Sequence, residues 1–147
     1  MKCLIEWEPA SGAVIKDKPS LFAWFADFAW KHGLISERES VAGMLESREY
    51  EGDTLLAANL ANPHIQGAIV TDTAMVFLKL ANPCAGWGSM PHVSRVLFTL
   101  IPKSAVARDI APLKNLYYRL ADESVMRRFC TEGRREVESI LRADEAT

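Results

Sequence analysis

The chain has 147 residues, of which 49% are hydrophobic and 24% are charged, with 8 glycines and 7 prolines. This composition excludes a disordered, collagenous or low-complexity protein, and the length predicts one globular domain over residues 1–147. The formal net charge of −2 gives no general field that would attract nucleic acid or an anionic membrane. We therefore expect neither as a partner.

The cysteines and the apolar segments bear on the compartment. Cys3, Cys84 and Cys130 lack the spacing of zinc or redox motifs and are typical of thiols in a reducing compartment. No stretch reaches the roughly 20 apolar residues of a membrane span, so direct membrane insertion is not expected. The chain begins with only three apolar residues before an acid, unlike a secretory signal. These features predict a cytoplasmic protein.

The first predicted helix covers residues 19–32, where apolar residues recur at helical spacing. Asp17 and Ser20 are candidate caps at its start, and Gly33 is a good stop. His32 lies at the end of this helix, where the dipole favours a cation, so a solvated histidine is the better interpretation there.

A second helix is predicted from Ser36 to about Arg48. Ser36 and Glu39 have the spacing of a capping box, in which each side chain bonds to the other residue's backbone N–H group. The inner face of this helix is expected to consist of Val41, Met44 and Leu45.

Strands are predicted in the middle of the chain. Short strands and a loop are expected over residues 51–70, and a strand with apolar residues on both faces over residues 73–80. A turn-rich segment follows at residues 82–88. Residues 95–101 are almost wholly apolar, which indicates a central strand that is covered on both sides, and Pro102 ends it.

The last third of the chain is predicted to be helical. Apolar spacing indicates one helix over residues 110–120, with Pro112 compatible with its first turn. Asp122 can start another helix, and Val137, Ile140 and Leu141 mark a final one. Helices, then strands, then helices predict an α/β fold: a three-layer α/β/α sandwich with one mixed central sheet.

The histidines are the first candidates for chemistry. No pair of them has the short spacing of a zinc site, so no bound metal is expected. His92 precedes a strand and is interpreted as a turn residue. His64 follows Asn62-Pro63, and proline holds Asn62 extended and stiffens the entry to the imidazole. On this alone, an ordinary turn histidine remains the commoner case.

Several motifs around His64 resemble those of one family. Arg48-Glu49, the turn Gly52-Asp-Thr54 and the run Leu60-Ala-Asn-Pro-His64 stand in order, with Thr54 ten residues and Arg48 sixteen residues before His64. This arrangement resembles the enzyme IIA components of the sugar phosphotransferase system, mannitol/fructose type. That family has an Arg-Glu pair at a helix end, a Gly-Thr turn and an Ala-x-Pro-His stretch.

The resemblance continues through nearly the whole chain. Leu80-Ala-Asn-Pro83 with Trp87-Gly88 is similar to the family's segment after its next strand, and residues 96–102 are similar to its central strand. Leu113, Leu116 and Leu120, followed by Asp122-Glu-Ser-Val125, match its late helix and the turn after it. The order and spacing of these pieces make the resemblance specific.

The resemblance implies a phosphoryl carrier. His64 would accept a phosphoryl group from a histidine phosphocarrier protein and pass it to a cysteine of enzyme IIB, since neutral imidazole has the needed lone pair. Arg48 would neutralise the phosphoryl oxygens, although it is also a cation at a helix C-terminus. Thr54 and the amides of residues 59–64 would add neutral donors. No cofactor is required, because the phosphocarrier supplies activated phosphate.

The chain departs from the family in two places. Ala57 and Asn59 replace glycines between the threonine and the histidine, and alanine tolerates positive φ poorly. Asp109 stands where many members keep a second histidine near the start of the late helix. A carboxylate there would orient His64 but repel a phosphoryl group, and Arg108 and Lys103 could offset the repulsion. An N-cap is an equally good interpretation of Asp109.

Two functions from different classes remain open. The first is a phosphotransferase enzyme IIA that carries phosphate on His64, favoured by the Arg48, Thr54 and His64 set. The second is a regulatory module of the same fold, whose phosphorylation state or shape controls a partner protein, favoured by the Asp109 replacement. The sequence does not identify the sugar, the oligomeric state or the imidazole nitrogen, although the family precedent suggests Nε2.

Overall fold

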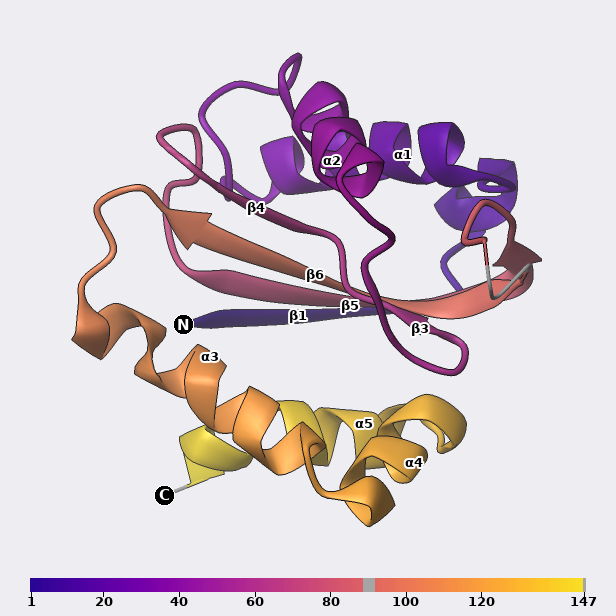
Figure 1. Ribbon diagram of the computed structural model, residues 1–147, viewed down its shortest axis with the longest axis vertical. Helices are drawn as coiled ribbons and strands as arrows, with labels where there is room; N and C mark the ends of the chain where they lie inside the picture. The colour runs from indigo at the N-terminus through magenta and orange to yellow at the C-terminus, as the bar shows by residue number, and fades with distance from the viewer. Residues whose placement is uncertain (89–91, 147) are drawn as a thin grey trace.

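The computed structural model describes residues 1–88 and 92–146 and places a mixed sheet between two layers of helices (Figure 1). Two helices cover one face, and three cover the other. This arrangement confirms the predicted three-layer sandwich. The first layer contains α1 (Lys18–Lys31) and α2 (Val41–Tyr50), and the second contains α3 (Ala107–Leu120), α4 (Glu123–Thr131) and α5 (Arg134–Leu141).

The sheet is built around its two long strands, which are antiparallel to each other. Its order is β1-β5-β6-β3-β2, and β4 also pairs with β6. The strand β1 runs parallel to β5, β3 and β4 run parallel to β6, and β2 is antiparallel to β3. The strands are β1 (Lys2–Trp7), β2 (Leu55–Ala57), β3 (Leu60–Ala61), β4 (His64–Gly67), β5 (Ala74–Cys84) and β6 (Val93–Pro102).

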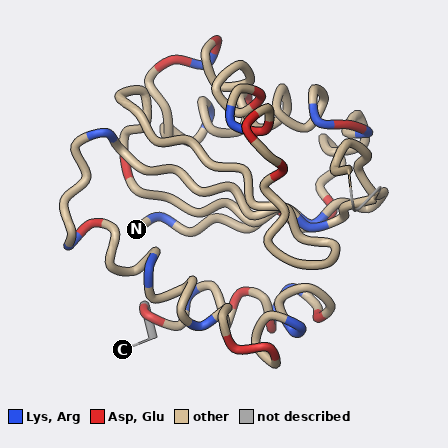
Figure 2. Tube along the Cα trace, viewed as in Figure 1, with Lys and Arg blue, Asp and Glu red and all other residues tan. Residues whose placement is uncertain are grey.

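The strand β6 is central, as its apolar sequence predicts. Phe98 faces the layer of α1 and α2, where its ring stacks on Phe25 with the ring centroids 3.8 Å apart. Leu97 faces the other layer, where Phe77 meets the edge of the Phe129 ring at 5.0 Å. Charged residues lie mainly on the helices and connections, and the strands are almost free of them (Figure 2). Each face of the sheet is therefore closed by its own apolar core.

The capping predicted for the first helix is confirmed. The Asp17 carboxylate accepts a hydrogen bond from the Ser20 backbone N–H at 3.0 Å, and the Ser20 hydroxyl accepts one from the Asp17 N–H at 3.1 Å. The side-chain and backbone hydrogen bonds from Ser20 lower the pKa of Asp17. Gly33 follows the helix at φ 68°, a left-handed conformation that suits glycine.

The predicted start of the second helix is wrong. The helix α2 begins at Val41, and the Ser36 N–H and hydroxyl both donate to the Ile69 carbonyl, at 2.8 and 3.3 Å. Ile35 forms an isolated antiparallel bridge with Val70. The backbone around Ser36 therefore pairs with the segment after β4, so the capping box with Glu39 does not form. The inner-face prediction holds for Val41 and Leu45, which are buried, while Met44 is half-buried.

Three further expectations differ from the structure. A strand, β1, precedes the helices, and its six residues all pair with β5. The strand β5 continues to Cys84, beyond the expected end at Leu80. Pro112 lies in the second turn of α3, because that helix begins at Ala107. No helix in the described ranges has the length and hydropathy needed to cross a bilayer.

Candidate functional site

His64 lies directly after a break between two short strands, β3 and β4. The strands β3 and β4 pair with the same edge of β6 in one register, with Leu60 opposite Arg95 and His64 opposite Thr99. Asn62-Pro63 forms the break, although the Pro63 carbonyl still accepts a hydrogen bond from the Thr99 N–H at 3.0 Å. His64 is the first residue of β4, and its position is therefore fixed by the central strand.

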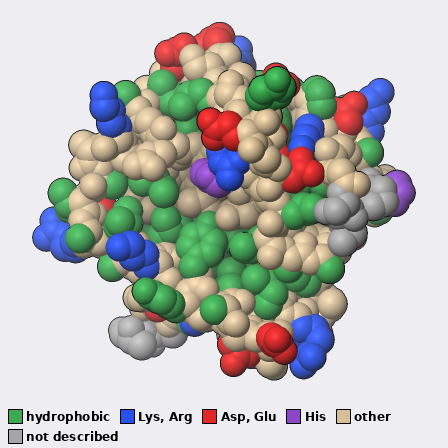
Figure 3. All heavy atoms as spheres, viewed as in Figure 1, with side chains coloured by type: hydrophobic (Ala, Val, Ile, Leu, Met, Phe, Trp, Pro, Cys, Tyr) green, Lys and Arg blue, Asp and Glu red, His purple; other side chains and the backbone are tan. Residues whose placement is uncertain are grey.

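The His64 side chain borders an open groove of about 680 Å³ between α2 and β4. Figure 3 shows hydrophobic side chains gathered in the middle of one face, with lysines and arginines both within this face and along its outline. His64 is half-buried, so one side of its ring is reachable from the groove. The groove is lined by Ser40, Gly43, Met44, Ser47, Arg48, Glu51, His64, Ile65 and Gln66.

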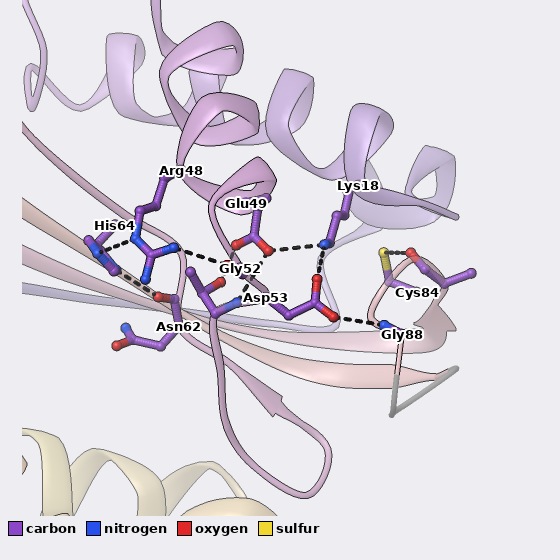
Figure 4. Close-up of polar contacts among 11 residues, drawn as sticks. Lys18, Arg48, Glu49, Gly52, Asp53, Asn62, His64, Cys84 and Gly88 are labelled. Atoms are coloured by element: carbon purple, nitrogen blue, oxygen red, sulfur yellow. Dashed lines mark hydrogen bonds and ion pairs between the residues drawn. The ribbon is translucent and has the colours of Figure 1, made fainter.

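Two hydrogen bonds set the protonation of the imidazole. Nε2 of His64 lies 3.1 Å from Nε of Arg48, and Nδ1 lies 3.2 Å from the carbonyl oxygen of Asn62 (Figure 4). A guanidinium can only donate, so Nε2 accepts, and the proton of the neutral ring is on Nδ1. Nδ1–H then donates to the carbonyl. The nitrogen with the lone pair is therefore the one beside the cation.

Arg48 is held by the end of its own helix. It lies in the last turn of α2, and Nη1 donates to the Gly52 carbonyl at 3.0 Å. Gly52 has φ 152°, a conformation that side-chain-bearing residues rarely adopt, so glycine suits this turn. The predicted pair of Arg48 and His64 is in direct contact.

Thr54 is placed differently from the sequence expectation. Its hydroxyl and its N–H both donate to the buried carboxylate of Glu49, the N–H at 3.2 Å. The Thr54 carbonyl accepts from the Asn62 N–H at 2.6 Å. The hydroxyl is thus occupied by Glu49, and Thr54 ties the turn after α2 to the segment that precedes His64.

A charged cluster that the sequence analysis did not identify fixes the same turn. Nζ of Lys18 lies 3.0 Å from the Glu49 carboxylate and 2.9 Å from that of Asp53, and the other Asp53 oxygen accepts from the Gly88 N–H at 2.8 Å (Figure 4). Burial lowers the pKa of Lys18, but the two carboxylates outweigh it and raise the pKa. The Lys18 and Gly88 hydrogen bonds lower the pKa of Asp53. Lys18 lies 35 residues before Asp53, so no local motif marks its contacts with Glu49 and Asp53.

Asn62 is a second residue whose contacts were not predicted. Its Nδ2 donates to the Leu97 carbonyl at 2.6 Å and to the Thr99 hydroxyl at 3.0 Å, and Tyr117 donates to its Oδ1 at 2.8 Å. Burial raises the pKa of Tyr117, although its bonds with Thr99 and Asn62 act in the opposite direction. The sequence signal that could have identified Asn62 is its position: a polar residue directly before a proline, in a run that is otherwise apolar.

The hairpin between β2 and β3 accommodates the two replaced glycines. Only Asn59 has positive φ, 64°, and asparagine tolerates that conformation well. Its side chain accepts from the N–H and hydroxyl of Ser94, at 2.7 and 2.9 Å. Ala57 lies in β2, where no positive φ is required. The expected difficulty with alanine at this turn does not arise.

Asp109 lies apart from His64. It is the third residue of α3, and its carboxylate accepts from the Val106 N–H at 3.4 Å. It borders a different hollow, which Lys2 and Asp72 also line. Within the described part of the chain, no hydrogen bond joins Asp109 to His64. Asp109 therefore caps the start of α3 from inside its first turn, and Val106 occupies the N-cap position.

The remaining candidates have structural surroundings. His32 caps the end of α1 and packs against the Phe28 ring at 4.2 Å, and His92 is exposed. Burial raises the pKa of Cys84 to about 11 and also raises that of Cys130, so neither is an activated thiol. Among the described residues, no three histidine, cysteine or acidic side chains come together as metal ligands would.

The comparison with known families now decides the relationship. A family model described as "Phosphoenolpyruvate-dependent sugar phosphotransferase system, EIIA 2" matches residues 11–143. The chain belongs to this EIIA family. A search of the curated proteins finds no match. The resemblance inferred from the Arg48, Thr54 and His64 motifs is confirmed at the level of the family.

Solved structures agree with this EIIA fold. The nitrogen regulatory protein IIA-Ntr from Neisseria meningitidis has a TM-score of 0.69 and 23% identity, over 95% of this chain and 91% of that one. Enzyme IIA-Mtl from Escherichia coli, in complex with phosphorylated enzyme IIB-Mtl, has a TM-score of 0.65 and 22% identity, over 95% and 99%. The crystal structure of Escherichia coli IIA mannitol has a TM-score of 0.63 and 21% identity, over 95% of this chain and 95% of that one.

The charged cluster around Lys18 gives a pH-dependent expectation. Asp53→Asn removes one carboxylate of the cluster, so the variant should be less stable than the wild type at pH 7. The folded-state pKa of Asp53 is lowered, so its contribution is present above about 3.9, the ordinary aspartate value, and is lost as the pH falls through the folded value. Urea unfolding should therefore show a smaller difference in unfolding free energy between the wild type and Asp53→Asn at acidic pH than at neutral pH.

Asp27→Asn is the matched control, because Asp27 pairs with Arg38 at 3.3 Å while both side chains are at least half exposed. Its effect should be smaller at neutral pH, since exposed ion pairs contribute little. If the loss of unfolding free energy in Asp53→Asn stays constant across the pH range, the stabilising role of the Asp53 carboxylate is contradicted.

Proposed function

We propose that this EIIA is a cytoplasmic phosphoryl carrier that accepts a phosphoryl group on Nε2 of His64 from a histidine phosphocarrier protein and passes it to a cysteine of enzyme IIB. The observation that carries the proposal is the pair of hydrogen bonds on the imidazole, which puts the proton on Nδ1 and the lone pair on Nε2. The groove beside Nε2 is open to a partner.

The transfer follows from this protonation state. The Nε2 lone pair forms a bond to phosphorus while the bond from phosphorus to the phosphocarrier nitrogen breaks, and the electron pair of that bond returns to the phosphocarrier ring. The Nδ1 proton stays in its hydrogen bond with the Asn62 carbonyl, which stabilises the positive charge that develops on the ring. In the second transfer, a cysteine thiolate attacks phosphorus and Nε2 regains its lone pair.

Arg48 has two successive roles in this proposal. In the resting state its Nε–H holds the Nε2 lone pair, and that hydrogen bond must be released before phosphorus can approach. Its link to Gly52 keeps the guanidinium beside the reacting nitrogen, where its N–H groups donate to the phosphoryl oxygens. Donors held beside the reacting nitrogen in this way stabilise the charge of the transferring group once the bond to Nε2 has been released.

Thr54 and Asp109 act at a distance from the phosphoryl group. The Thr54 hydroxyl is engaged by Glu49, so Thr54 positions the turn that carries the Arg48 contact. Asp109 caps α3, so this chain works without the second histidine that many family members have. Enzyme IIB as a partner is supported by the fold shared with the Escherichia coli IIA-Mtl, which was solved in complex with phosphorylated IIB-Mtl.

A regulatory role is the alternative, in which the phosphorylation state or the shape of the protein controls a partner. The observation that favours it is Asp109, which replaces the second histidine and does not contact His64. The fold shared with a protein described as nitrogen regulatory is consistent with this alternative. The two roles differ in the acceptor, because only the first requires transfer to an enzyme IIB cysteine.

Intact mass after incubation with phosphoenolpyruvate, enzyme I and the phosphocarrier tests the proposal. We expect an acid-labile gain of about 80 Da, the mass of one phosphoryl group. His64→Ala should abolish the gain, while His32→Ala should retain it, because His32 lies at the end of α1 and outside the groove. Absence of the gain with several phosphocarriers would overturn the carrier function and leave the regulatory one.

Arg48 substitutions test the role of the cation. Arg48→Gln should slow the single-turnover uptake of phosphate by about a hundredfold, the usual effect of removing a donor to a developing oxyanion. Arg48→Lys keeps the charge but loses the fork of donors, so it should fall between Arg48→Gln and the wild type. Arg38→Gln, at an exposed arginine, should match the wild-type rate. Equal rates for all four proteins would contradict the role.

A further inference from the structure

The parallel ladder beside His64 lacks one backbone donor. In such a ladder, a carbonyl that takes part in the bonding accepts a hydrogen bond from an N–H of the neighbouring strand. The donor is the residue that follows the one directly opposite. The register on both sides of the break places Asn62 opposite Leu97, so the Leu97 carbonyl should receive the N–H of residue 63. Residue 63 is proline and has no N–H. A buried carbonyl without a partner would be costly.

The side chain of Asn62 supplies the missing donor. Its Nδ2 donates to the Leu97 carbonyl at 2.6 Å, at the place where the ladder bond is missing. The residue that precedes the proline thus replaces the proline's hydrogen bond. On the other side of the proline, the ladder resumes with the Thr99 N–H bonded to the Pro63 carbonyl at 3.0 Å.

A closed ring of hydrogen bonds holds the Asn62 amide in this orientation. The Leu97 carbonyl can only accept, so Nδ2 must face it, and Oδ1 then accepts from the Tyr117 hydroxyl at 2.8 Å. Nδ2 also donates to the Thr99 hydroxyl at 3.0 Å, and the Thr99 and Tyr117 hydroxyls are 3.0 Å apart. With Tyr117 donating to Asn62, Thr99 donates to Tyr117, which closes the ring.

The same asparagine presents its backbone carbonyl to the imidazole. That oxygen lies 3.2 Å from Nδ1 of His64, while the Asn62 N–H is bonded to the Thr54 carbonyl at 2.6 Å. In Figure 4 the Asn62 side chain points away from the ring and its carbonyl points toward it. Four polar groups of one buried residue are therefore occupied, and the carbonyl has little freedom to turn away.

We propose that Asn62 is a positioning residue for phosphoryl transfer, and that Tyr117 supports it from the opposite helical layer. Asn62 bridges the gap that Pro63 leaves in the ladder and thereby fixes the carbonyl that keeps the His64 proton on Nδ1. This inference rests on the proposed function for its effect on rate. Its effects on the imidazole and on stability are independent of any partner.

A rescue experiment tests the bridge itself. Asn62→Leu removes the amide at similar volume, and Pro63→Ala restores a backbone N–H that can donate to Leu97. Urea unfolding should show that Asn62→Leu is destabilised and that adding Pro63→Ala recovers most of the loss. Pro63→Ala alone should give no gain, because the Leu97 carbonyl is already occupied. Additive effects of the two substitutions would overturn the bridge.

The imidazole provides a readout that a purely structural role would not move. Long-range ¹H–¹⁵N spectra of ¹⁵N-histidine protein at alkaline pH report which ring nitrogen carries the proton. The wild type should have it on Nδ1, and Asn62→Leu should show a mixture of the two tautomers. Tyr117→Phe should show a smaller change in the same direction. Tyr118→Phe is the matched control, because Tyr118 is 76% exposed, and should equal the wild type.

The transfer rate completes the test. Asn62→Leu should slow phosphoryl uptake by about tenfold, a loss comparable to that of one hydrogen bond, and the double variant should recover much of it.

A folded Asn62→Leu with the wild-type tautomer and rate would overturn the proposal. If Asn62→Leu does not fold, Tyr117→Phe decides, and a wild-type spectrum from that variant would overturn the proposal. A wild type that takes up no phosphate would defeat the proposed function, while the tautomer and rescue results would still decide the bridge.

Discussion

A guanidinium can only donate hydrogen bonds, and this constraint organises the site. Because Arg48 donates to Nε2 of His64, the neutral imidazole must carry its proton on Nδ1, and the Asn62 carbonyl is placed to accept it. A single contact thus selects the tautomer and, in the transfer that we propose, the nucleophilic nitrogen and the cation that meets the phosphoryl group. The turn after α2 holds Arg48, and the break before β4 places His64, so that the two side chains meet.

The fold supplies this geometry through the central strand. The strand β6 holds β3 and β4 in one register, so the break at Pro63 displaces the chain locally without shifting the strands around it. On the other side, Lys18 joins Glu49 and Asp53 and fixes the turn whose Gly52 carbonyl receives Arg48. The site is therefore assembled from both the sheet and the layer of α1 and α2, and hydrogen bonds or ion pairs hold each part.

The sequence predicted the parts of this account that depend on local patterns. The caps of α1 and the central strand were predicted from local residue patterns, and Arg48 and His64 from motifs that resemble those of the EIIA family. The start of α2 was not, because Ser36 pairs with Ile69 across the fold, and the contacts of Lys18 and Tyr117 join residues far apart in the chain. The role of Asp109 was left open between a site residue and a cap, and the structure places it as a first-turn cap.

The central claim is that Nε2 of His64 is the reacting nitrogen. The most direct measurement is the ³¹P–¹⁵N coupling in ¹⁵N-histidine protein that has been phosphorylated, read together with the ring ¹H–¹⁵N correlations that distinguish the two nitrogens. The account predicts phosphorus on Nε2 with the proton still on Nδ1 beside the Asn62 carbonyl. Phosphorus on Nδ1 would contradict it, because that nitrogen is occupied by its own proton and hydrogen bond in this structure.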